Sequence, residues 1–365
     1  MSTTFRIVIV ALMLLALFFG FLHHFVSADV DLNFERLHIF LFNLCAGGTI
    51  LLYHTENRQK PSPKVIGFLV LAILYALFAF IEIYPPAILI AFALAAIVEK
   101  IRVSRFSRFP SNFFAPATSV YLKFHQAALL CLSMGLSISA MVILNNRYLH
   151  LVSFPKLTLD TFFLGFSFPL SLITMSVMFS LITDDHRRTT RVLKNIGFWS
   201  VTLGVITFFI FILLENLYSQ LAVSTLLFCA VVMIFGLFAR EGVQPQQKNF
   251  LISGMVFLLF TAVSGIVYIF LEFTPGYDRD ASALLLRMHA FASLYGWNLS
   301  GFAVICRYND FPIRLHSRKL VIGHWVTVIF FAPFGYYSPP FAIAAMISYT
   351  MIVYMIFFTR RSVAE

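Results

Sequence analysis

The sequence predicts an all-α polytopic membrane protein with about twelve transmembrane helices. Of its 365 residues, 60% are hydrophobic and 12% are charged, about half the charged share of a typical soluble domain. Apolar stretches of the length that crosses a bilayer, roughly 20 residues, recur from one end of the chain to the other. The loops between them are short, so we expect no sizeable soluble domain.

The twelve spans follow one another with little sequence between them. The first ends at His23-His24 and lacks the small-residue cleavage site of a signal peptide, so we keep it as a helix. The fourth is short and begins at Pro85-Pro86, and we expect it to form a tight hairpin with the third. In order, the predicted spans are residues 5–26, 37–54, 65–83, 85–98, 120–144, 159–183, 195–215, 220–239, 250–272, 284–306, 320–336 and 339–358.

The basic residues predict the orientation of these spans. With the N-terminus in the cytoplasm, most of the 26 Lys and Arg residues fall on the inner side, and the C-terminus lies there too. The net charge of +10 therefore reflects the orientation of the spans. We expect the protein to lie in the cell inner (plasma) membrane, with inner loops that contact anionic lipid. We expect no nucleic-acid partner, because no soluble basic module is present. On the inner side, Arg102, Arg105 and Arg108 predict a snorkelling rim or a short interfacial helix.

A faint internal repeat predicts three four-helix units within a single integral membrane domain. The second and tenth spans open with the same Arg-x-His pattern, at residues 36–38 and 287–289. They lie eight spans apart, so a period of four makes the second, sixth and tenth spans equivalent, all entering the membrane from the outer side. The domain covers residues 1–365, with its units at about 5–98, 120–239 and 250–358.

The histidines of this pattern predict a haem site. A low-spin haem takes two nitrogen ligands on opposite faces of its ring, and small residues let the ring approach the helices. We expect His38 and His289 to be these ligands, with Gly48 and Gly296 nearby on the same helices.

Two arginines and several other groups complete the candidates. We expect Arg36 and Arg287, two residues outward from the histidines, to neutralise the anionic propionates of a haem. The alternative pairs each arginine with a neighbouring carboxylate, and it leaves the two histidines a hydrogen-bonded structural role. The carboxylates in question are Glu35 and Glu82 for Arg36, and Glu272, Asp278 and Asp280 for Arg287. Further candidate metal ligands are the pairs His23 with His24 and His125 with His324.

The twelve spans and their histidines resemble subunit I of the haem–copper oxidases. That family has three four-helix units, an inner N-terminus, and histidines on the outer halves of the second and tenth helices. The segment from His289 to Gly301, with its Gly296-Trp297 pair, is similar to the tenth helix of the nitric-oxide-reductase-like branch. The resemblance covers the chain as architecture and implies that His38 and His289 ligate a low-spin haem.

The copper site of that family has no counterpart in this chain. Its ligands come from the sixth and seventh helices, and here the spans 159–183 and 195–215 contain no histidine. The tenth span also lacks a second histidine for a high-spin haem. We therefore expect no oxygen- or nitric-oxide-reducing site. The chain is also similar to the NnrS-type membrane proteins, which share the twelve-span plan and are associated with haem and copper.

These observations predict a membrane protein that binds haem or a metal for electron transfer, haem or metal handling, or sensing. Its expected partners are membrane lipids and a redox partner or partner subunit. The alternative is a secondary transporter of a small solute, because twelve spans with repeats also fit that class. Against transport, no charged residue lies near the middle of a span, and only Pro169 and Pro333 are obvious helix breaks.

Overall fold

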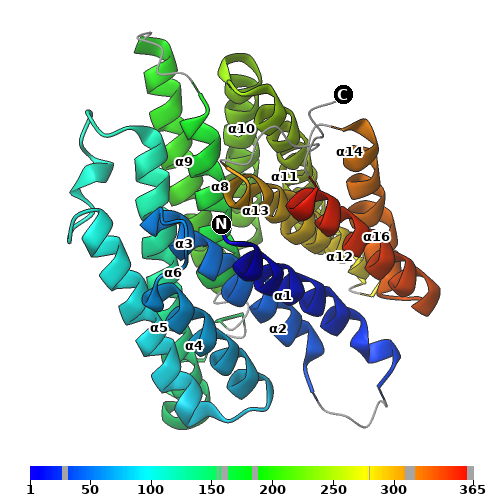
Figure 1. Cartoon of the computed structure of the whole chain (residues 1–365). Helices are drawn as coiled ribbons and strands as arrows, with labels where there is room; N and C mark the ends of the chain where they lie inside the picture. The colour runs from blue at the N-terminus through cyan, green and yellow to red at the C-terminus, as the bar shows by residue number, and fades with distance from the viewer. Residues whose placement is uncertain are drawn as a thin grey trace. The chain divides into compact units, whose positions relative to one another are not determined.

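The structure, a computed structural model, is helical throughout the residues that it describes (Figure 1). These are residues 1–26, 32–153, 156–157, 163–182, 188–278, 280–308 and 317–359. The chain divides into two compact units. The first unit comprises Met1–Thr118 and His125–Ile173, and the second unit comprises Ser119–Phe124 and Thr174–Glu365.

The first unit is built from the N-terminal helices. Its elements are α1 (Thr3–Phe21), η1 (Leu22–His24), α2 (Phe34–Ile39), η2 (Phe40–Gly48), α3 (Thr49–Glu56), α4 (Pro63–Phe80), α5 (Tyr84–Arg105), η3 (Ser111–Phe113), most of α6 (Val120–Leu144), η4 (Asn145–Leu149), η5 (Phe163–Ser167) and the start of α8 (Phe168–Ser180). α1 packs against α2 and η2, and α4 packs against α5 and η2. The nine residues of η2 are all buried, so this segment forms the centre of the unit.

The second unit contains the remaining helices. They are the rest of α8, α9 (Arg188–Leu213), α10 (Leu217–Glu241), α11 (Pro245–Glu272), α12 (Ala283–Phe291), η6 (Ala292–Asn298), α13 (Leu299–Cys306), α14 (Arg318–Trp325), η8 (Val326–Phe331), α15 (Ala332–Gly335) and α16 (Pro339–Phe358). α10 packs between α9 and α11, while α11 also contacts α12 and η6. The buried face of α11 thus supports the helix that carries His289.

Several helices begin where the sequence supplies a cap or a proline. The Asn33 side chain accepts a hydrogen bond from the Arg36 N–H at 2.8 Å, which satisfies one backbone donor at the start of α2. At the start of α4, Ser62 accepts a hydrogen bond from the Val65 N–H at 3.3 Å. Pro63 follows in the first turn, where the missing N–H of proline has no helical partner to lose.

Some of these helices contain π-helical segments. The π-helix is rare, at well under 1% of residues, and is frequent at functional sites. η2, η5 and η6 lie in the second, sixth and tenth predicted spans, which the internal repeat makes equivalent. Two more π segments, η4 and η8, follow α6 and α14. The three spans therefore share this feature, although it is not restricted to them.

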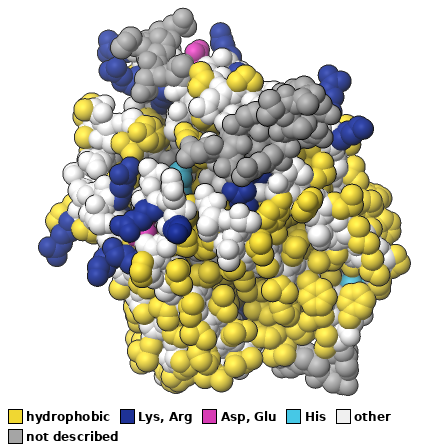
Figure 2. All heavy atoms as spheres, viewed as in Figure 1, with side chains coloured by type: hydrophobic (Ala, Val, Ile, Leu, Met, Phe, Trp, Pro, Cys, Tyr) yellow, Lys and Arg dark blue, Asp and Glu magenta, His cyan; other side chains and the backbone are white. Residues whose placement is uncertain are grey.

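The helices have the length and surface of membrane spans. Among the described residues, eight helices are long and apolar enough to cross a bilayer. Large apolar side chains lie exposed on them, and Figure 2 shows hydrophobic side chains over much of one face of the molecule. An exposed apolar surface of this extent indicates contact with lipid. The chain is therefore an all-α, multi-pass membrane protein, as its composition predicted.

The predicted spans correspond closely to the observed helices. Each of the twelve stretches coincides with a helix or with a run of α and π turns, and the sixth can be followed from residue 163 onward. The eight helices that qualify as spans are Thr3–His24, Phe34–Glu56, Pro63–Phe80, Val120–Leu149, Arg188–Leu213, Leu217–Glu241, Pro245–Glu272 and Pro339–Phe358. The number of twelve crossings and the side on which the termini lie remain predictions.

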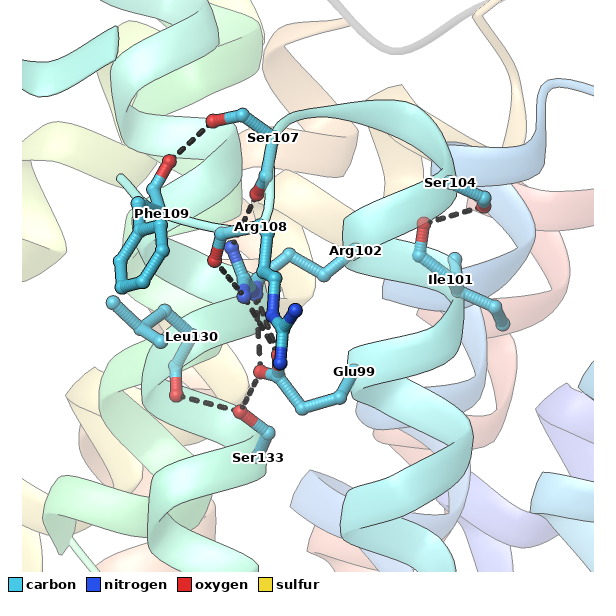
Figure 3. Close-up of polar contacts among 9 residues, drawn as sticks. All are labelled: Glu99, Ile101, Arg102, Ser104, Ser107, Arg108, Phe109, Leu130 and Ser133. Carbon is cyan, nitrogen blue, oxygen red and sulfur yellow. Dashed lines mark hydrogen bonds and ion pairs between the residues drawn. The ribbon is translucent and has the colours of Figure 1, made fainter. Parts of the chain in front are cut away.

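The end of α5 differs from the expected snorkelling rim. Arg102 is buried, with 4% of its surface exposed, and its guanidinium donates to both carboxylate oxygens of Glu99. It also donates to the carbonyl oxygens of Ser107 and Arg108, each at 3.0 Å (Figure 3). Ser133 of α6 donates to the same carboxylate. Arg102 therefore holds the turn after α5 in place, because its five donors match a carboxylate and two carbonyls at once.

Candidate functional site

His38 docks on the preceding helix, α1. Its Nδ1 atom lies 2.9 Å from the carbonyl oxygen of Ala16, and only 7% of the residue is exposed. Because a carbonyl oxygen can only accept, Nδ1 carries the hydrogen in the neutral ring, and Nε2 carries the lone pair. Gly20 makes the approach possible, since a Cβ atom at this position would lie 2.7 Å from Nδ1.

His289 docks on the helix that precedes it, α11. Its Nδ1 lies 3.3 Å from the hydroxyl oxygen of Ser264, which in turn donates to the Thr261 carbonyl oxygen at 3.0 Å. A Cβ atom at Gly265 would lie 3.1 Å from Cε1 and 3.4 Å from Nδ1 of the ring. The imidazole is therefore tied through Nδ1 to α11, as the imidazole of His38 is tied to α1.

The two docks use the same spacing on the supporting helix. In α1, Ala16 accepts from the His38 ring through its carbonyl oxygen and precedes Gly20 by four residues. In α11, the Thr261 carbonyl is linked to the His289 ring through the Ser264 hydroxyl, and Thr261 precedes Gly265 by four residues. Residues four apart lie on the same face of a helix, so one face offers both a carbonyl and the room for a ring. We call this arrangement the carbonyl–glycine dock. It occurs once in each unit, at the two histidines of the repeated Arg-x-His pattern.

The helix that carries each histidine changes from α-helical to π-helical turns shortly after it. α2 gives way to π turns at Phe40, two residues after His38, and α12 does so at Ala292, three residues after His289. The α-helix resumes at Thr49 and at Leu299. The two helices that carry the histidines therefore share the same order of α, π and α turns.

The glycines beside the imidazole rings are not the predicted ones. A Cβ atom at Gly48 would lie 3.1 Å from the Phe68 ring of α4. A Cβ atom at Gly296 would overlap the side chain of Phe257 in α11. Gly48 and Gly296 thus make room for aromatic packing between helices, whereas Gly20 and Gly265 make room for the histidines. A glycine in the apolar span next to each Arg-x-His span was the signal that could have identified them.

The two predicted arginines have different surroundings. Arg36 lines a pocket in the first unit together with Tyr75 and Tyr84. Arg287 places its guanidinium carbon 3.7 Å from the ring centroid of Tyr336, a cation–π contact. Glu82, a suggested partner of Arg36, forms an ion pair with Arg147 at 3.4 Å.

The other histidines have structural neighbours. In the first unit, His125 stacks on His54 with ring centroids 5.4 Å apart, and its Nε2 lies 2.8 Å from the Thr55 hydroxyl. In the second unit, His324 Nε2 donates to the Tyr295 carbonyl oxygen at 2.6 Å. The suggested pair of His125 and His324 thus divides between the two units. The rings of His23 and His24 lie 4.1 Å apart in η1.

A metal cage built from several side chains is not seen in the described parts of the chain. Within them, no three or more His, Cys, Asp or Glu residues are grouped so that they could hold a metal ion. A haem with two axial histidines needs only one residue on each side of the iron, so the predicted haem site requires no such group. His38 and His289 belong to different units. That their rings face each other across one haem remains a prediction.

Comparison of the chain with protein-family models, curated proteins and solved structures found no match. The candidate function therefore depends on the residues and on the two docks.

Proposed function

We propose that this protein binds haem through His38 and His289 and serves in electron transfer, in haem or metal handling, or in sensing. The observation that supports the proposal is the carbonyl–glycine dock, repeated at both histidines. A histidine that ligates a metal usually donates its other ring N–H to a carbonyl or carboxylate, which fixes the ring and raises the basicity of the ligating nitrogen. The Nδ1 contacts of both rings match that arrangement, with Nε2 as the nitrogen that would ligate iron.

The charged residues near the docks also suit a haem, whose propionates are anionic. Arg36 and Arg287 lie two residues before the histidines in the same helices, α2 and α12. Guanidinium groups in these positions neutralise propionates. A haem with two histidine ligands supplies one-electron transfer, and the protein residues hold it, orient it and compensate its charge.

An optical spectrum of the purified protein tests the proposal. The wild type, expressed with haem available, should show the oxidised and reduced bands of a low-spin haem with two histidine ligands. His38→Ala and His289→Ala should each abolish that spectrum. His54→Ala and His324→Ala are the matched controls, because each removes another inward-facing histidine from one of the two units, and both should keep it.

Two results would overturn the haem proposal. One is a wild type that stays colourless after haem is supplied, and the other is a spectrum that survives both alanine variants in the docks. In either case the secondary transporter of a small solute becomes the better interpretation.

We propose further that the protein lies in the cell inner membrane with twelve spans and both termini in the cytoplasm. The distribution of Lys and Arg supports this orientation. Reporter tags at both termini should give cytoplasmic signals, and a tag between α6 and α8 should give a periplasmic one. A periplasmic signal from either terminus would contradict the orientation without bearing on the haem spectrum.

A further inference from the structure

The first unit contains a pocket whose lining shares one residue, Arg36, with the haem proposal. Its volume is about 110 Å³. The lining residues come from seven helical elements and are Arg36, Phe40, Tyr75, Ala79, Tyr84, Ser139, Val142, Ile143, Asn146, Arg147 and Phe166. They lie at the start of α2 and α5 and at the end of α4 and α6, so the pocket opens at one end of this helix group.

The inner wall of the pocket is apolar and aromatic. Phe40 meets Tyr75 edge to face, with ring centroids 5.2 Å apart, and lies 5.6 Å from Phe166. The hydroxyl groups of Tyr75 and Ser139, both buried, share a hydrogen bond. This wall therefore accepts a hydrocarbon stem, and its polar atoms already have partners.

The rim of the pocket is positively charged. Its lining includes two guanidinium groups, Arg36 and Arg147, and no carboxylate. Arg147 donates to the Tyr84 hydroxyl at 2.6 Å and lies 4.5 Å from the centroid of that ring, which fixes its direction. Its ion pair with Glu82, at 3.4 Å, joins two side chains that are each at least half exposed, so the pairing is weak and can be exchanged for a ligand.

We infer that this pocket binds an oxyanion carried on an apolar stem, such as the phosphate of an anionic lipid or the carboxylate of a free fatty acid. Binding sites for small molecules are usually apolar pockets with a few polar groups that fix orientation. Two guanidinium groups at the rim favour a carboxylate or phosphate, which accepts charge-assisted hydrogen bonds from both. The aromatic wall takes up the first carbons of the stem.

The test uses the full-length protein in detergent and in lipid nanodiscs, with no haem-dependent readout. Octanoate is the free-acid probe, and octanamide is its uncharged match. Phosphatidylglycerol nanodiscs, compared with phosphatidylcholine nanodiscs, are the lipid probe. Octanoate or phosphatidylglycerol should raise the thermal unfolding midpoint, because a ligand that binds only the folded state stabilises it. Octanamide and phosphatidylcholine should not.

Variants at the rim distinguish the pocket from general charge effects. Arg36→Gln and Arg147→Gln should each weaken binding about tenfold, the effect of losing one charge-assisted hydrogen bond. Arg58→Gln removes an equal charge from an exposed turn of the same unit and should leave binding unchanged. Ala79→Leu fills the pocket without changing charge and should abolish binding of both probes.

Each outcome decides the inference. A response to octanoate alone identifies a free acid, and a response to phosphatidylglycerol alone identifies a lipid. Absence of both responses in the folded wild type overturns the inference, as does binding that Ala79→Leu and the two rim variants leave intact. Loss of the haem spectrum in the histidine variants does not alter this test.

Discussion

The two carbonyl–glycine docks use the same spacing but differ in how tightly they hold the ring. At His38 the ring is 7% exposed, and its Nδ1 lies 2.9 Å from a carbonyl oxygen. At His289 the ring is partly buried, and its Nδ1 lies 3.3 Å from the Ser264 hydroxyl. A Cβ atom at Gly20 would lie 2.7 Å from the His38 ring, whereas a Cβ atom at Gly265 would lie 3.1 Å from the His289 ring. The Ala16 carbonyl holds the first ring directly, whereas the second ring is held through the Ser264 side chain and has more room beside it.

The largest effect is expected from closing the tighter dock. Gly20→Ala should destabilise the protein by about 1–2 kcal/mol, because overlap with the His38 ring exceeds the helix-propensity gain of alanine. It should also weaken the haem spectrum as the ring turns away from Ala16. Chemical unfolding in detergent and the optical spectrum measure both effects. Gly67→Ala in α4 is the control, since a Cβ there meets nothing within 4 Å, and it should be neutral or stabilising.

A smaller effect should come from the start of the two histidine helices. Asn33 caps α2 through its side chain, while Ser282 makes no side-chain cap at α12. Asn33→Ala should therefore cost about 1 kcal/mol, and Ser282→Ala should cost close to nothing. Unfolding midpoints of the two variants provide the comparison. Equal losses would show that capping does not distinguish the two docks.

The smallest effects belong to the looser dock. Gly265→Ala should change stability by less than about 0.5 kcal/mol, because the His289 ring can shift by the few tenths of an ångström that a Cβ needs, and alanine favours the helix. Ser264→Ala should cost about 0.5 kcal/mol, the low end for a hydrogen bond, because the contact with His289 Nδ1 is long, at 3.3 Å. A loss at Gly265→Ala as large as that at Gly20→Ala would mean that the two docks are equally rigid.

Two arginines of the first unit, Arg102 and Arg147, form a second contrast. Arg102 is buried and donates to a carboxylate and two carbonyls (Figure 3). Arg147 is half exposed, with a weak ion pair at the rim of a pocket. From the sequence we expected Arg102 at the membrane surface, because a buried and an exposed arginine at a span end cannot be told apart in the sequence. The contacts make Arg102 a structural residue and Arg147 a candidate ligand group.

The class of this protein and the repeated Arg-x-His pattern can be read from the sequence alone. Low charge and recurring apolar runs are properties of composition, and lipid is the solvent that they require. The docks could not be predicted from the sequence, because Gly20 and Gly265 are separated from their histidines in the chain and only helix packing brings them together. The same packing places Gly48 and Gly296 against phenylalanine rings. Which glycine serves which ring is decided by contacts between helices, and a single sequence carries no direct record of them.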